Sequence, residues 1–130
     1  NATPSANSSA ALALARLGAL TGEARYTNHA DQIIRLLARA VPQSPAAFSQ
    51  ALMAVASRQA GATEIVITGD RRDLLAEVRR HWLPDAVMAW GEPFDSPLWH
   101  QRADGLAFVC HDHACQLPAE NVTDLAAQLL

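Results

Sequence analysis

The sequence has few aromatic residues and no lysine. Only 5% of its 130 residues are aromatic although 50% are hydrophobic, so aliphatic side chains and alanine must supply most of the core. Such a composition favours closely packed helices over an aromatic-rich β-sandwich. The net charge is −3, and the arginines are scattered apart from two adjacent pairs, so we expect no nucleic-acid partner.

Features of membrane and secreted proteins are also lacking. No stretch approaches the ~18 consecutive apolar residues that a membrane span requires, and no basic segment followed by an apolar one opens the chain as in a signal peptide. Two cysteines are too few for a disulfide framework and fit a reducing compartment. We therefore expect a cytoplasmic protein without a membrane partner.

Three helices are predicted in the first part of the chain. Thr3 followed by Pro4 is typical of a helix start, and because the chain reaches it at once without a methionine, we expect a piece cut from a longer protein. Apolar residues at helical spacing lead to Gly22. They continue over 23–42 and again over 44–61, with proline and glycine ending the segments.

The pattern changes to that of a small α/β unit after Gly61. A β-branched run at 64–68, helical spacing at 74–82 and an apolar run at 86–90 predict a parallel βαβ unit. The runs 106–110 and 115–117 flank a polar turn and predict a hairpin, and a last helix follows Asn121.

The predicted fold class is therefore α+β, with an α/β unit after helices. We expect two parts: helices over residues 1–61, and over 62–130 a βαβ unit, a β-hairpin and a C-terminal helix.

The run from Cys110 to Cys115 places four possible metal ligands in six positions, the two cysteines with His111 and His113. Zinc prefers cysteine and histidine, but structural zinc sites pair two distant clusters, and alternating hairpin side chains cannot all converge. The cysteines flank the turn, so a reversible disulfide across the hairpin is a second interpretation. A third, which we favour, is that both cysteines are structural.

A polar segment surrounds the predicted helix start, with Ser5, Asn7 and Ser8 as candidate ligand-binding residues. Free N–H groups at a helix N-terminus favour an anion or a sugar hydroxyl. Capping by Thr3 or Ser5 is the simpler interpretation. At the end of the first strand, Asp70 is similarly expected to cap the following helix rather than to bind a ligand.

No established catalytic arrangement is present. The sequence contains no Ser-His-Asp order, no paired-carboxylate motif and no Walker sequence. We therefore assign no catalytic residue, no metal and no cofactor to this chain.

Taken together, several segments resemble a family of thioredoxin-domain-containing proteins, the spermatogenesis-associated thioredoxin-like proteins. The resemblance follows the chain in order through TPSANS at 3–8, LTG at 20–22, EIVITGD at 64–70, RHWLP at 80–84, FVC at 108–110 and ACQLP at 114–118. Members of that family keep the two cysteines without the histidines between them. This difference argues against a metal at His111 and His113.

The resemblance implies a larger parent protein with three pieces. These are an N-terminal thioredoxin domain, an α/α toroid similar to sugar epimerases and six-hairpin glycosidases, and a C-terminal α/β extension. Residues 1–61 would be the last toroid helices and 62–130 the extension, with the rest of the parent chain, or a second copy of the fragment, as partner.

Three functions follow from this resemblance and from the residues. The fragment is a structural part of a protein of undefined activity, it forms one wall of a carbohydrate-type ligand site near Asn7, or Cys110 and Cys115 exchange with the separate thioredoxin domain. The parent would then be a sugar epimerase-like or a thiol-redox enzyme. We favour the structural role for the fragment, which is not expected to be catalytic alone.

Overall fold

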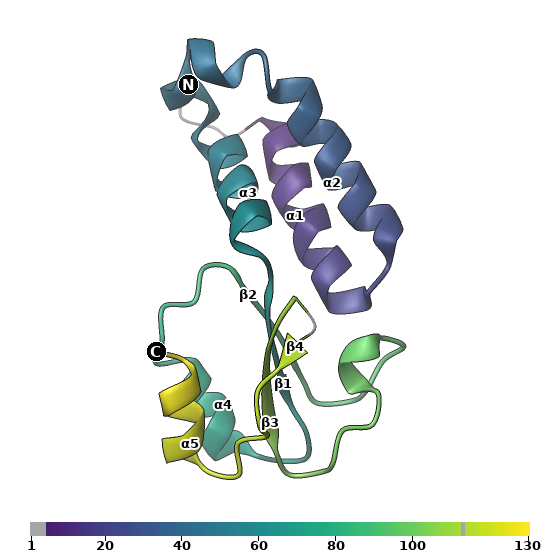
Figure 1. Ribbon diagram of the computed structural model, residues 1–130, viewed down its shortest axis with the longest axis vertical. Helices are drawn as coiled ribbons and strands as arrows, with labels where there is room; N and C mark the ends of the chain where they lie inside the picture. Colours follow the sequence, from purple (N-terminus) through teal and green to yellow (C-terminus); the bar gives the residue numbers. More distant parts are fainter. Residues whose placement is uncertain (1–4, 113) are drawn as a thin grey trace. The chain divides into compact units, whose positions relative to one another are not determined.

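Local signals in the first part of the chain produce three α-helices, α1 (Ala6–Thr21), α2 (Ala24–Leu37) and α3 (Ser49–Ala60) (Figure 1). The computed structural model describes residues 5–112 and 114–130, so the predicted start at Thr3 and Pro4 lies outside it. Gly22 ends α1 in the left-handed conformation at φ 71°. Pro42 and Pro45 lie at the starts of two short 3-10 helices, η1 (Val41–Gln43) and η2 (Pro45–Phe48), which connect α2 to α3.

Small side chains let these helices approach closely. Ala11 and Ala54 are fully buried where α1 packs on α3, and Ile33 and Ile34 of α2 complete this cluster. The α-carbon of Gly18 faces Thr27 of α2 so closely that a β-carbon would collide with the threonine hydroxyl. An alanine-rich sequence thus forms this cluster from closely packed aliphatic side chains.

The second part of the chain forms a mixed four-stranded sheet with the strand order β2-β1-β3-β4. Its strands are β1 (Thr63–Ile67), β2 (Ala86–Trp90), β3 (Ala107–His111) and β4 (Ala114–Cys115). The helix α4 (Arg72–Val78) joins the parallel strands β1 and β2, as the βαβ prediction requires. The hairpin strand β3 pairs antiparallel with β1, on the side away from β2.

The two faces of this sheet have different environments. Ile65 and Ile67 of β1 and Val109 of β3 pack against α4 and against α5 (Val122–Gln128), forming the apolar core of the unit. The loop that contains the 3-10 helix η3 (Pro97–Trp99) contacts β1. Figure 1 shows α4 and α5 on one side of the sheet and this loop on the other.

The α+β fold class is confirmed, with helices first, then the βαβ unit, the hairpin and the C-terminal helix. Asn121 caps α5 by accepting a hydrogen bond from the backbone N–H of Asp124 at 2.9 Å, as its spacing predicts. The prediction that Asp70 caps α4 is wrong. Arg71 occupies the cap position, and the Asp70 carboxylate instead accepts a hydrogen bond from Arg72 at 3.0 Å.

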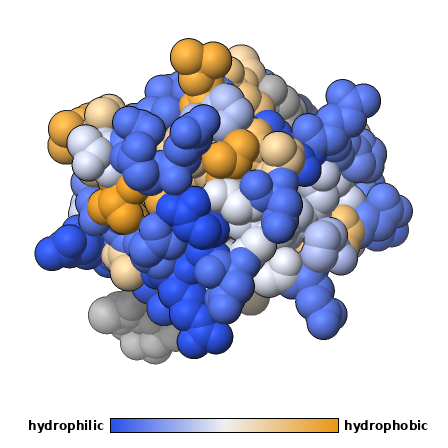
Figure 2. Space-filling view, turned by 90° about the horizontal axis from the view of Figure 1, so that it is seen from below, coloured by the Kyte–Doolittle hydropathy of each residue, from blue (hydrophilic) through white to orange (hydrophobic). Residues whose placement is uncertain are grey.

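The chain divides into two compact units, with the boundary in the sequence between Gly61 and Ala62. Among the described residues, no helix combines the length and the apolarity needed to cross a bilayer. Figure 2 shows one face of the molecule, on which hydrophilic side chains predominate and apolar ones lie in small separate groups.

Candidate functional site

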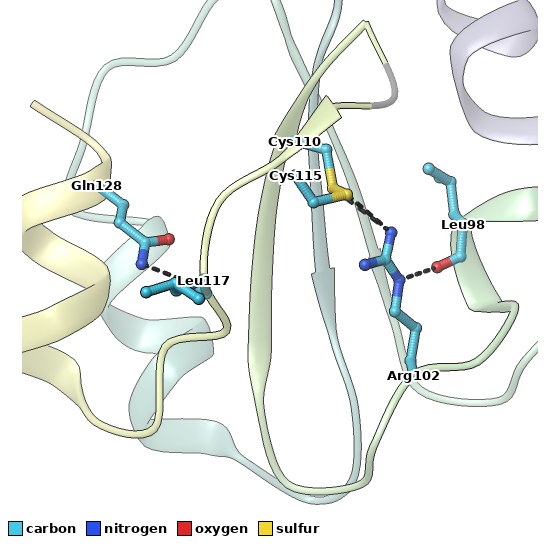
Figure 3. The surroundings of a disulfide bond; sticks show 6 residues. All are labelled: Leu98, Arg102, Cys110, Cys115, Leu117 and Gln128. Carbon is cyan, nitrogen blue, oxygen red and sulfur yellow. Dashed lines mark hydrogen bonds between the residues drawn. A yellow bond between two sulfur atoms is a disulfide. The ribbon is translucent and has the colours of Figure 1, made fainter.

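The hairpin of β3 and β4 brings the two cysteines together. Cys110 and Cys115 are directly opposite each other in the antiparallel register and are joined by a disulfide bond (Figure 3). The turn between the strands is held in place by Asp112, which has a left-handed φ of 46°. Its backbone N–H donates to the Ala62 carbonyl at 3.0 Å, and its carboxylate accepts from the Ala62 N–H at 3.1 Å. Ala62, the residue before β1, therefore anchors the start of the hairpin turn.

A buried carboxylate extends this cysteine pair into a row across three strands. Glu64 of β1 is the register partner of Cys110, which is in turn the partner of Cys115. Side chains at directly opposed positions lie on the same face of a sheet, about 5 Å apart at their β-carbons. Glu64 and Cys110 are each only 1% exposed, whereas Cys115 is an exposed residue at the sheet edge. We call Glu64, Cys110 and Cys115 the cross-strand row.

Arg102, from the loop before β3, places a positive charge at both sulfurs. Its Nη2 donates to Cys115 Sγ at 3.2 Å and to Cys110 Sγ at 3.4 Å, as Figure 3 shows. Two contacts fix this position: the Nε donates to the Leu98 carbonyl at 3.0 Å, and the guanidinium carbon lies 4.5 Å from the ring centroid of Phe108. Burial lowers the pKa of Arg102, while the negative charge of Glu64 acts in the opposite direction.

Arg102 also borders a hollow at the carboxyl ends of the parallel strands. This hollow has a volume of about 310 Å³ and is lined by Thr68, Gly69, Gly91, Pro93, Trp99, Arg102 and Asp104. It is the edge at which ligands bind in open α/β sheets. Asp70, the neighbour of Gly69 in the chain, is not among the lining residues.

The other predicted site residues belong to the helical unit. Ser5 is the N-cap of α1: its Oγ accepts from the Ser8 backbone N–H at 3.1 Å and lies 2.8 Å from Ser8 Oγ. Ser8 is only 2% exposed, whereas Asn7 is exposed in the first turn of the helix. Ser5 and Ser8 therefore use their polar atoms on each other, and their role as ligand-binding residues stays a prediction together with that of Asn7.

Within residues 5–112 and 114–130, no three histidine, cysteine or acidic side chains are grouped so that they could hold a metal ion. His111 lies in the described part, with its Nε2 3.9 Å from Asp112 Oδ2, while His113 lies outside it. The two sulfurs, which would be the strongest zinc ligands of the run, are bonded to each other.

Comparison with known proteins identifies a distant partial homologue. The chain is 26% identical over 140 residues to spermatogenesis-associated protein 20 of Homo sapiens, and the match covers 95% of this chain. The chain spans only 18% of the length of that relative. No family model and no solved structure matches this chain.

Proposed function

We propose that the α/β unit carries a thiol–disulfide exchange site formed by Cys110 and Cys115. The observation that carries this proposal is the Arg102 guanidinium, which donates to both sulfurs. A thiolate is the nucleophile and the leaving group of disulfide exchange, and an adjacent arginine stabilises it. A purely structural disulfide does not need a positive charge at its sulfurs.

We propose different roles for the two cysteines because Cys110 is buried and Cys115 is exposed. A thiolate of a partner attacks Sγ of the exposed Cys115, the bond between the two cysteines breaks, and the buried Cys110 leaves with the electron pair as a thiolate near Arg102. The second thiolate of the partner then attacks the mixed disulfide, and Cys115 leaves. Two electrons pass from the partner dithiol, which becomes a disulfide, to the hairpin, whose thiolates take up protons from water.

The proposed co-reactant is a protein dithiol of the thioredoxin type, because the family resemblance implies such a domain in the longer parent protein. We propose the reducing cytoplasm as the compartment. The glutathione pool of the cytoplasm has a reduction potential of about −220 to −320 mV, and the hairpin disulfide would need a reduction potential near this range to be reversibly reduced and oxidised.

A redox titration tests this function. The chain is equilibrated in glutathione and dithiothreitol buffers between about −150 and −320 mV, the free thiols are alkylated, and each species is quantified by mass spectrometry. A reversible transition that transfers two electrons is expected within this range, with Cys110→Ser as the control that cannot form the bond. Thiols that stay reduced at every potential, or a disulfide that persists at the lowest one, would contradict the proposal.

We also propose that the helical unit is a wall of a larger helical barrel, the structural role expected from the sequence. Supporting this, α1, α2 and α3 expose large apolar side chains, with Leu36 at 70% and Met53 at 52% exposure. An apolar groove lies among the same helices, lined by Ala11, Ile34, Leu37, Ala38, Val41, Pro42, Ala51, Leu52 and Val55. The proposed occupant is a further helix of the longer protein.

Light scattering tests this second proposal on the chain alone. Without its occupant the apolar surface is expected to cause self-association, which Leu36→Ser should weaken. Leu117→Ser is the matched control, because Leu117 is 85% exposed on the other unit. A monodisperse monomer at all concentrations would contradict the proposal.

The carbohydrate-type site near Asn7 is the finer part of this structural proposal. It is supported by the exposure of Asn7 at the N-terminal turn of the 16-residue helix α1. Mono- and disaccharides are titrated into the longer parent protein and its Asn7→Ala variant, with exposed Asn28→Ala as control. Unchanged sugar affinity in Asn7→Ala would remove Asn7 from the site.

A further inference from the structure

We infer that Glu64 is the proton-transfer group of the cysteine pair, because it lies in the cross-strand row directly opposite the buried Cys110. This inference rests on the exchange function proposed above. It assigns a role to a residue that takes no part in that proposal.

Glu64 is an ionisable residue in a strand that is otherwise almost entirely apolar and buried. The rest of β1 is Thr63, Ile65, Val66 and Ile67, and the sheet position of Glu64 is only 1% exposed. Placing a carboxylate in such a position costs free energy unless charged or polar partners compensate, and apolar side chains usually fill it as well or better. Its register partner on the other side, Val87 of β2, is apolar. Glu64 is therefore a buried ionisable group beside the cysteine pair.

Groups of the exchange site surround Glu64 in the cross-strand row. Cys110 faces it from β3, Cys115 follows on β4, and the charge of Arg102 interacts with it from the loop before β3. Arg102 stabilises a thiolate but stays protonated, so it cannot accept the thiol proton. Glu64 is the group in the row that can accept it.

The step assigned to Glu64 is the closing of the disulfide. A mixed disulfide joins Cys115 to an external sulfur, and Cys110 is a thiol. The Glu64 carboxylate takes the proton of Cys110 as its sulfur attacks Cys115 Sγ, which forms the bond between the two cysteines. The external sulfur leaves as a thiolate with the electron pair of the broken bond, and Glu64 releases the proton to water.

Reaction of the fully reduced chain with an aromatic disulfide reagent, dithiobis-nitrobenzoate, separates the two steps. The first nitrothiolate is released when Cys115 attacks the reagent, and the second when Cys110 resolves the mixed disulfide. General-base catalysis contributes about 10²–10⁴-fold. Glu64→Gln is therefore expected to slow the second release at least ~10-fold near pH 7 while the first stays within ~2-fold.

Two further measurements separate proton transfer from a structural effect. The difference between Glu64→Gln and wild type should shrink above about pH 9, where thiols ionise without a base. Glu64→Asp keeps the carboxylate at a shorter reach and should slow only the second release; it also serves where the glutamine variant does not fold. Glu77→Gln is the matched control, since Glu77 is a buried carboxylate of α4 that interacts with His81 and Arg80.

The outcomes distinguish this inference from the proposed function. A wild type that releases no second nitrothiolate contradicts the exchange function itself. A wild type that releases both, with Glu64→Gln and Glu64→Asp as fast in the second step, overturns the role of Glu64 alone. Equal slowing of both steps at every pH would mean that Glu64 only positions Arg102, which also overturns it.

Discussion

Arg102 is the side chain whose removal should most affect the reactivity of the cysteines. In Arg102→Gln the positive charge at 3.2 Å from Cys115 Sγ and 3.4 Å from Cys110 Sγ is lost, while a hydrogen-bonding amide remains. The thiolate of Cys115 in the reduced protein then loses its neighbouring charge. Arg102→Lys is the control that keeps the charge.

The magnitude follows from the distance between the charges. Two unit charges separated by 3.2 Å attract by about 1.3 kcal/mol at a dielectric constant of 80 and about 5 kcal/mol at 20. Because Arg102 is only partly buried, we take the lower part of that range, about 1.4–2.8 kcal/mol, which is about 10- to 100-fold in thiolate population. The remaining thiolate is more nucleophilic with a Brønsted slope of about 0.5, so the net rate falls about 3- to 10-fold.

Alkylation kinetics measure this rate. Reduced protein with Cys110→Ser, which leaves Cys115 as the single thiol, is treated with iodoacetamide near pH 6–7 with and without Arg102→Gln, and the adduct is followed by mass spectrometry. Arg72→Gln, which removes an exposed arginine of the same unit, should leave the rate unchanged. A folded Arg102→Gln variant that reacts as fast as its parent would refute the role of Arg102.

Three predictions concern stability. A hydrogen bond from Arg71 lowers the pKa of Asp73 from 3.8 to about 2, so its stabilising contribution is complete above pH 3.8 and lost as the pH falls towards 2. Asp73→Asn should therefore weaken the pH dependence of the urea unfolding midpoint over that window. A variant with the same pH dependence as the wild type would contradict this. Gly18→Ala forces a β-carbon against the Thr27 hydroxyl and 3.3 Å from its backbone nitrogen, which should lower the free energy of unfolding in urea by about 1–3 kcal/mol. Thr27→Ala should partly restore that loss, and additive losses in the double variant would exclude this clash. Reduction of the disulfide should lower the free energy of unfolding by about 2 kcal/mol without unfolding the chain. Loss of the folded circular-dichroism signal on reduction would contradict this prediction.

Short-range signals predicted most of the fold. Helical spacing located α1, α2 and α3, and the β-branched run located β1, because these patterns report burial within one element. Glycine and asparagine marked element ends because their conformational and capping preferences act within a few residues: Gly22 ends α1 and Asn121 caps α5. Asp70 misled for the same reason, since its side chain bonds to a neighbouring arginine instead of the helix.

The site depended on pairing between distant segments, which sequence periodicity does not report. The cysteine pair was visible because both cysteines flank one turn. In the sequence Glu64 belongs to the pattern of a buried strand, and its relation to Cys110 appears once β3 pairs with β1 in a particular register. Arg102 belongs to an irregular loop without a pattern of its own. The available signal was a single glutamate within a β-branched run, which period-two alternation puts on the face opposite Ile65 and Ile67.

The position of the disulfide within the unit is more consistent with exchange than with a structural staple. Its cysteines are five positions apart, and a cross-link across so short a loop removes little entropy from the unfolded chain, about 2 kcal/mol, against about 4.7 kcal/mol for a 100-residue loop. The apolar core lies on the other face of the sheet, between β1, β3 and the two helices, and contains neither cysteine. Breaking the bond is therefore expected to leave that core intact, with the turn still held by the hydrogen bonds between Asp112 and Ala62. We therefore expect a disulfide that lies outside the apolar core, with one exposed cysteine and a guanidinium at both sulfurs, to open and close while the rest of the sheet stays folded.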